Sequence, residues 1–107
     1  MDDDGYRITV RLDAADAVRV LLAGEFDLSN ATELTEALTQ AAARAGVARV
    51  VVDMRDTTFL DSSGSRAIAI AYAAALDAGK EFRLENLQHQ VRRVFEILEM
   101  TVLFQQP

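Results

Sequence analysis

The sequence contains no cysteine, which excludes disulfide bonds and thiolate metal sites and favours a reducing compartment. It also has no stretch of 18 consecutive apolar residues, the length that a membrane-spanning helix needs. Residues 1–5 are acidic and lack the basic-then-apolar order of a signal peptide. No linker, internal repeat or low-complexity tract is present, and the only proline is Pro107. We therefore expect a cytoplasmic protein that does not enter the membrane.

Positive charge is scarce. The sequence has 11 Lys and Arg residues against 17 Asp and Glu residues, so the net charge is −6. This balance argues against a nucleic-acid partner and against docking on anionic lipid, because both favour basic surfaces. A protein partner suits an acidic chain better. With 107 residues, 50% of them apolar, the chain can form one hydrophobic core. We expect a single monomeric domain over residues 1–107, with residues 1–5 flexible.

Two stretches near the N-terminus have the alternating pattern of half-buried strands. Apolar residues occupy every second position in 6–12, which predicts a strand with one buried face. The same pattern recurs in 18–22, after the polar corner 13–16. The two strands are predicted to form a hairpin with a turn of about four residues. Gly24 is expected to end the second strand.

A helix and a buried strand follow this hairpin. Ser29 or Asn30 is expected to cap a helix that buries its leucines and alanines and ends at Gly46. Residues 47–54 include three consecutive valines without polar alternation, which predicts a central, buried strand. Residues 55–60 are then expected to form a short loop.

The second half of the sequence continues the alternation of helices and strands. The patterns predict a helix over 63–78, a strand over 81–85, a helix over 90–99 with Leu98 on its apolar stripe, and a short strand at 102–104. Strand–helix–strand units imply parallel neighbours joined by right-handed crossovers. The predicted fold class is α/β, with a mixed sheet of four to five strands and three main helices.

The most informative segment is 58–65, which leads from the buried strand into the second helix. Binding sites in open α/β sheets lie beyond the carboxyl ends of the strands. A hydroxyl at a helix start is accessible, and a phosphate placed on it would find free backbone N–H groups. The alternative interpretation is that Asp61 or Ser62 only caps the helix, which is the usual role of these residue types there.

The surrounding sequence resembles the STAS domain family, and most closely its bacterial anti-sigma factor antagonists. The resemblance covers nearly the whole chain, and its signature loop is specific. Four segments occur in the family's order: Gly24-Glu25-Phe26-Asp27; Val50-Val51-Val52-Asp53 followed by Phe59-Leu60-Asp61-Ser62-Ser63-Gly64; Ala78-Gly79-Lys80 followed by Phe82-Arg83-Leu84; and Val91-Arg92-Arg93-Val94-Phe95-Glu96-Ile97-Leu98.

The resemblance implies a partner-switching phosphoprotein that regulates transcription. In such families the unphosphorylated antagonist binds an anti-sigma factor that is also a serine kinase, and the sigma factor is released. The kinase uses ATP to phosphorylate a loop serine, and a metal-dependent phosphatase reverses this step. By alignment of the motif the acceptor is Ser62, with Ser63 as the second choice. The expected contacts with the partner are Asp27, Asp61, Ser62, Ser63, Gly64 and Ser65.

The sequence departs from the family at two places. Ser65, followed by Arg66, stands where the family commonly has a leucine. The segment 88–90 lacks the Ser-Pro that often precedes the last helix. The first departure affects how the rim of the loop meets its partner, and neither removes the acceptor serine.

The same residues do not favour catalysis, a phosphate-binding loop or metal binding. A hydrolase would need Ser62, an aspartate and His89, the only histidine, but a surface or capping role suits His89 better. No Gly-rich phosphate loop is present, and Asp2-Asp3-Asp4 reads as a solvated tail rather than a metal site. We therefore expect no enzymatic activity, cofactor or metal. Two alternatives stay open: an adaptor subunit of a lipid transporter, and a scaffold of a stress-signalling complex that does not switch.

Overall fold

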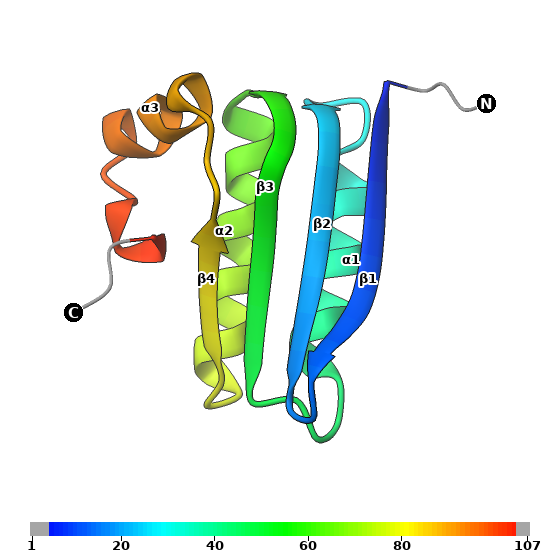
Figure 1. Ribbon diagram of the computed structural model, residues 1–107. Coiled ribbons are helices and arrows are strands. Elements are labelled where there is room, and N and C mark those ends of the chain that lie inside the picture. The colour runs from blue at the N-terminus through cyan, green and yellow to red at the C-terminus, as the bar shows by residue number, and fades with distance from the viewer. Residues whose placement is uncertain (1–4, 105–107) are drawn as a thin grey trace.

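The computed structural model describes residues 5–104, so the expectations for residues 1–4 lie outside it. A four-stranded sheet has the order β1-β2-β3-β4 (Figure 1). Its strands are β1 (Tyr6–Ala14), β2 (Ala17–Phe26), β3 (Arg49–Leu60) and β4 (Glu81–Glu85). β1 and β2 pair antiparallel, whereas β2, β3 and β4 run parallel. The mixed sheet predicted from the sequence is confirmed, with four strands.

The helices are α1 (Ala31–Ala43), α2 (Ser62–Asp77) and α3 (His89–Ile97), as predicted to within a few residues. The prediction of a short terminal strand at 102–104 is wrong, because Thr101–Leu103 forms a turn of 3₁₀-helix. The free edge of β4 is therefore not extended by a fifth strand in the described part of the chain.

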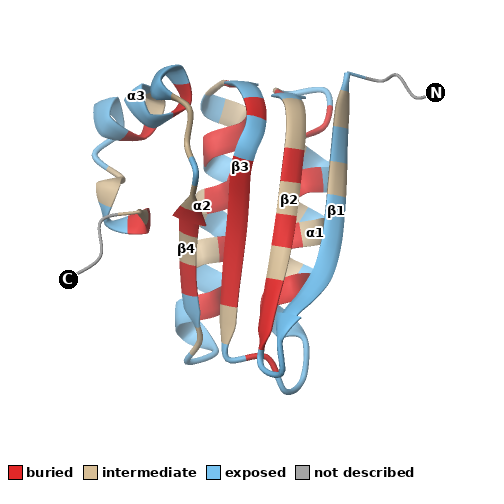
Figure 2. Ribbon diagram, viewed as in Figure 1, coloured by how far each residue is buried: buried red, intermediate tan, exposed pale blue. Residues whose placement is uncertain are grey.

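Both crossover helices lie on the same face of the sheet. The units β2–α1–β3 and β3–α2–β4 step across the sheet in the same direction, and right-handed connections then place α1 and α2 on one side. Figure 1 shows the two helices behind the strands. The core lies between them and the sheet, where β3 is mostly buried and β2, α1 and α2 each bury one face (Figure 2). Within residues 5–104, neither crossover helix lies on the opposite face of the sheet.

The second strand is longer than its sequence pattern indicates. β2 continues through Gly24 to Phe26, because Gly24 adopts a φ of +96° that a side chain would rarely allow. A Cβ atom at Gly24 would lie 2.1 Å from the carbonyl oxygen of Gly5. The glycine therefore allows β1 to approach closely instead of ending the strand.

The loop predicted over 55–60 is wrong, since β3 extends to Leu60. Two register shifts let this polar stretch stay paired with β2. The buried hydroxyl of Thr57 donates a hydrogen bond of 2.8 Å to the carbonyl oxygen of Leu22. A polar sequence thus remains a strand because its polar groups find partners in the neighbouring strand.

β1 is less buried than its alternation suggests. Tyr6 and Ile8 pack against the core, but Val10 and Leu12 are 43% and 60% exposed. The strand lies at the edge of the sheet, beyond the helices for much of its length (Figure 2). The turn to β2 is also tighter than expected and contains only residues 15–16.

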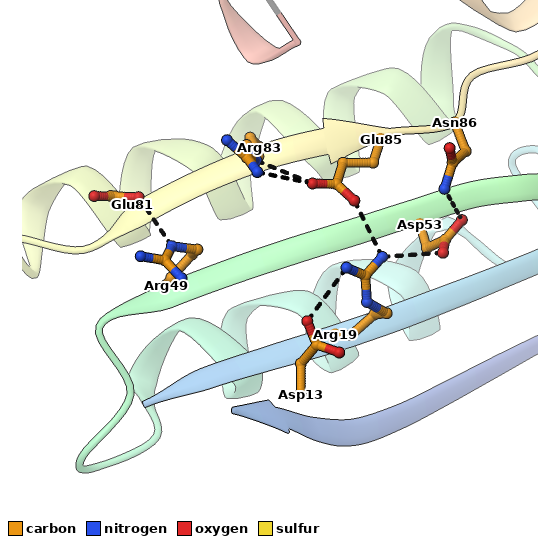
Figure 3. Close-up of polar contacts among 8 residues, drawn as sticks. All are labelled: Asp13, Arg19, Arg49, Asp53, Glu81, Arg83, Glu85 and Asn86. Atoms are coloured by element: carbon orange, nitrogen blue, oxygen red, sulfur yellow. Dashed lines mark hydrogen bonds and ion pairs between the residues drawn. The ribbon is translucent and has the colours of Figure 1, made fainter. Parts of the chain in front are cut away.

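The helix-free face of the sheet is covered by an ion-pair network (Figure 3). Arg19 on β2 lies 3.0 Å from a carboxylate oxygen of Asp53 and 3.2 Å from those of Asp13 and Glu85. Asn86 donates a further hydrogen bond of 3.1 Å to Asp53. Burial acts to raise the pKa of Asp53, but the hydrogen bonds from Asn86, from the Arg55 N–H and from Arg19 outweigh it and lower the pKa.

This network generates a prediction about acid stability. A carboxylate whose pKa is lowered by folding stabilises the protein above its unfolded pKa, and loses that contribution as the pH falls. Asp53→Asn should therefore lower the free energy of unfolding at pH 7 by about 1 kcal/mol. The difference from wild type should shrink below a pH of about 4, measured by urea unfolding at several pH values.

Glu81→Gln serves as the matched control, because the side chain of Glu81 is 70% exposed and pairs with Arg49 on the same face. Exposed pairs contribute little, so its effect should stay within about 0.5 kcal/mol at every pH. Equal effects of the two substitutions, or an Asp53→Asn effect that persists in acid, would contradict the assignment.

Candidate functional site

The carboxyl ends of the three parallel strands bring the predicted site residues to one edge of the sheet. β2 leads into the loop 27–30, and β3 leads directly into Asp61 and α2. The Asp61 N–H donates a hydrogen bond of 3.2 Å to the carbonyl oxygen of Phe26. The two segments that hold Asp27 and Ser62 are therefore tied together where the strands end.

Gly64 allows α2 to start directly above this contact. A Cβ atom there would lie 3.1 Å from the carbonyl oxygen of Phe26 and 2.5 Å from Cδ1 of Leu60. Gly64 is buried, so it presents little surface to a partner. The glycine of the motif thus serves close packing between the helix and the two strands.

Asp61 is the N-cap of α2, as one of the sequence interpretations had it. Its Oδ1 atom accepts hydrogen bonds from the Ser63 N–H at 2.9 Å and the Gly64 N–H at 3.1 Å. The Ser65 N–H donates to the backbone carbonyl oxygen of Asp61 at 3.0 Å. These donors are therefore occupied, and the expectation that a phosphate would find them free is wrong for these three N–H groups.

The three serines of the segment have different environments. Ser62 is the first residue of α2 and is exposed, whereas Ser63 is half-buried. Ser65 is only 1% exposed, and its hydroxyl donates a hydrogen bond of 3.0 Å to the carbonyl oxygen of Ser62. Ser65 therefore supports the first turn of the helix from inside and does not reach the surface as a contact.

The neighbouring loop is ordered by its own side chains. The carboxylate of Asp27 accepts hydrogen bonds from the hydroxyl and the N–H of Ser29, at 2.6 and 2.9 Å, which lower the pKa of Asp27. Asn30 occupies the N-cap position of α1 but makes no side-chain cap bond. Its buried amide instead accepts from the Asp27 N–H and donates to the Glu25 carbonyl oxygen. The caps expected from Ser29 and Asn30 are therefore replaced by bonds within the loop.

Large apolar side chains are exposed in the loop after β2, near the end of β3 and at the end of α3. The exposed fraction is 79% for Leu28, 71% for Ile97, 47% for Phe59 and 44% for Leu98. A hollow of about 320 Å³ adjoins the serines, and its lining consists of Ser62, Ser63, Ser65, Arg66, Leu98 and Met100. Exposed apolar side chains that gather beside a polar group are typical of a protein-binding surface.

The sequence patterns did not predict that most of these apolar side chains are exposed. Leu98 continues the spacing of the buried residues Val91 and Phe95, so the pattern placed it in the core. The predicted helix ran to residue 99, but α3 ends at Ile97. Leu98 therefore lies just beyond the end of the helix, where it is exposed. Leu28 was the one available signal, because an apolar residue in a polar loop has no core partner in the sequence pattern.

The residues of the rejected hydrolase arrangement do not meet. His89 is exposed at the start of α3, and no hydrogen bond joins it to Ser62 or to an aspartate within the described range 5–104. No group of three or more metal-ligating side chains occurs among those same residues. No helix in the described part of the chain is long and apolar enough to cross a membrane. The described residues therefore do not assemble the Ser–His–Asp arrangement that a hydrolase would need.

Comparisons with known proteins agree with this architecture. The sequence profile of the family described as "Mlab, STAS domain" matches residues 10–105. The structure resembles the anti-sigma factor antagonist SpoIIAA in its unphosphorylated form, with a TM-score of 0.80 and 18% identity over 94% of this chain and 88% of that one. The phosphorylated form of the Bacillus cell-fate determinant SpoIIAA has a TM-score of 0.74 and 17% identity, over 94% and 91% of the two chains.

An anti-sigma factor antagonist from Mycobacterium paratuberculosis has a TM-score of 0.79 and 21% identity, over 96% of this chain and 86% of that one. At these identities the solved structures establish a shared fold. The profile match, in contrast, spans most of the sequence. This chain belongs to the STAS domain family.

Proposed function

We propose that this chain is an anti-sigma factor antagonist, which binds an anti-sigma factor when Ser62 is unmodified and releases it when Ser62 is phosphorylated. The observation that carries the proposal is the exposed residue Ser62, held at the start of α2 beside a hollow that Leu98 and Met100 also line. Similarity to solved antagonists, one of them in a phosphorylated form, supports it.

The physical basis of the switch is a change of charge at the centre of the docking surface. The docking surface consists of Ser62 and Ser63 together with the rim formed by Leu28, Phe59, Ile97 and Leu98. A neutral hydroxyl is easily desolvated when a partner covers it, whereas a phosphate adds close to two negative charges. Burying that charge beside Asp61 costs several kcal/mol, which changes affinity by orders of magnitude.

The proposed partners follow from the resemblance to anti-sigma factor antagonists. The anti-sigma factor is the serine kinase that modifies Ser62 with ATP, and a metal-dependent phosphatase restores the free hydroxyl. Ser63 is the second candidate for the acceptor, and its half-buried position makes it the less accessible of the two. We place the interaction in the cytoplasm, where the chain acts as a binding protein and not as an enzyme.

The alternatives differ in what happens at Ser62. A lipid-transporter adaptor or a scaffold that does not switch would also use an exposed apolar surface, but its binding would not depend on a phosphate. Identification of the bound protein, and of phosphate on Ser62 by mass spectrometry after incubation with ATP and that partner, separates these functions from the proposed one.

Substitution of Ser62 tests the switch directly. Ser62→Ala should keep the affinity for the anti-sigma factor within about threefold, because it removes only an uncharged hydroxyl. Ser62→Asp should weaken binding by a factor of about 10 to 100, because it places a carboxylate in the interface. The measurement is a binding titration with the anti-sigma factor captured from the native cell, and equal affinities for both variants would rule out the switch.

The apolar rim generates a second prediction. Leu98→Glu should weaken the same interaction by a factor of about 10 or more, because it puts a charge where an apolar surface is buried. Leu76→Glu is the matched control, since Leu76 is 55% exposed near the other end of α2. Circular dichroism should show both variants folded. If both variants lost affinity equally, or neither lost any, the partner would not bind at Leu98.

A further inference from the structure

Arg66 lies one helical turn after Ser62 on α2. Residues four apart on a helix lie on the same face, with about 5–6 Å between their Cβ atoms. Both side chains are exposed, and both line the hollow of about 320 Å³ beside Leu98 and Met100. A group attached to the Ser62 hydroxyl would therefore extend into space that the guanidinium of Arg66 can reach.

The backbone at the start of α2 offers such a group little. The N–H groups of Ser63 and Gly64 donate to the carboxylate of Asp61, and that of Ser65 donates to the Asp61 carbonyl oxygen. Asp61 itself adds a negative charge next to Ser62. A cation from a side chain would stabilise a phosphate here, because these three N–H groups of the first turn are already occupied.

Arg66 is the basic side chain available for this purpose. Among residues 5–104 it takes part in no ion pair or side-chain hydrogen bond, and it is the only charged residue in the lining of the hollow. Arg92 on α3 is engaged elsewhere, with its guanidinium 4.6 Å from the centre of the Phe104 ring. The cation closest in sequence and on the same helix face is thus uncommitted.

We propose that Arg66 binds the phosphate of phosphorylated Ser62 through an ion pair across one turn of α2; this inference rests on the phosphorylation proposed above. The planar guanidinium can donate two hydrogen bonds to phosphate oxygens. Leu98 and Met100 form an apolar side of the hollow and limit the screening of this pair by water. Phosphorylation then changes the docking surface twice, since it adds a dianion and engages an exposed cation.

The test uses the full chain with phosphoserine incorporated at position 62 during translation. The second pKa of the phosphate is measured by ³¹P NMR titration, and an isolated phosphoserine gives a value of about 6. A nearby cation stabilises the dianion and lowers this pKa, whereas Asp61 and, across the edge, Asp27 act to raise it. Arg66→Gln should therefore raise the phosphate pKa by roughly half a unit relative to the phosphorylated wild type.

Two further variants make the outcome specific. Arg66→Lys keeps the charge and should retain more than half of the shift. Arg44→Gln removes the same charge at the C-terminal end of α1, next to the amino ends of the parallel strands and away from Ser62. It should leave the phosphate pKa within about 0.1 unit of wild type. A phosphate pKa unchanged by Arg66→Gln, or changed equally by Arg44→Gln, would overturn the proposal.

The result does not depend on the switch itself. Phosphoserine is introduced without a kinase, so the ion pair is tested even if no kinase modifies the chain. Failure of the proposed function would instead appear as an absence of phosphate on Ser62 after incubation of the unmodified chain with ATP and its partner. The two failures are therefore distinguishable.

Discussion

The handedness of two crossover connections determines the layout on which everything else depends. Because both steps run in the same direction across the sheet, right-handed connections put α1 and α2 on one face and leave the other face without a helix. The same parallel arrangement collects the loops after β2, β3 and β4 at a single edge. The apolar core, the charged open face with Arg19 and Asp53, and the loop with Ser62 are three consequences of one topology.

At that edge a single carboxylate has two effects. Asp61 caps α2, and this fixes the backbone of the first turn, where Ser62 is exposed. The same bonds occupy the N–H groups of Ser63 and Gly64, which a phosphate could otherwise bind. A phosphate on Ser62, as proposed above, would therefore be stabilised by a side-chain cation, and Arg66 lies on the same face of α2 and lines the same hollow.

Much of the fold could be predicted from the sequence, because periodicity reports burial. The alternation in β2 and β4, the stripe of α1 and the order of the elements are correct. The errors arise where a neighbour decides the outcome. β3 continues through polar residues because Thr57 finds a partner on β2, and β2 continues through Gly24 because β1 passes close to it. Neither contact leaves a signal in the local pattern.

In the candidate site, too, features set by local sequence could be predicted, whereas features set by packing between elements could not. The motif identified Asp61 and Ser62, whose roles depend on neighbours in sequence and hence on local rules for helix starts. Ser65 appeared as a third surface hydroxyl, but its burial is set by packing against the strands below. The apolar rim could not be predicted, since Leu98 has a core-like spacing and is exposed only because α3 ends beside it.

The packing beneath the loop argues that the proposed switch acts through charge and not through unfolding. Gly64 leaves no space between α2, the carbonyl oxygen of Phe26 and the side chain of Leu60, so the first turn cannot sink or tilt when Ser62 is modified. Phe26 and Leu60 belong to the core, and moving them would cost far more than reorienting one exposed arginine. A phosphate on Ser62 would thus meet a fixed backbone and adaptable side chains. In the proposed switch the fold would stay constant, and only the surface that a partner encounters would change.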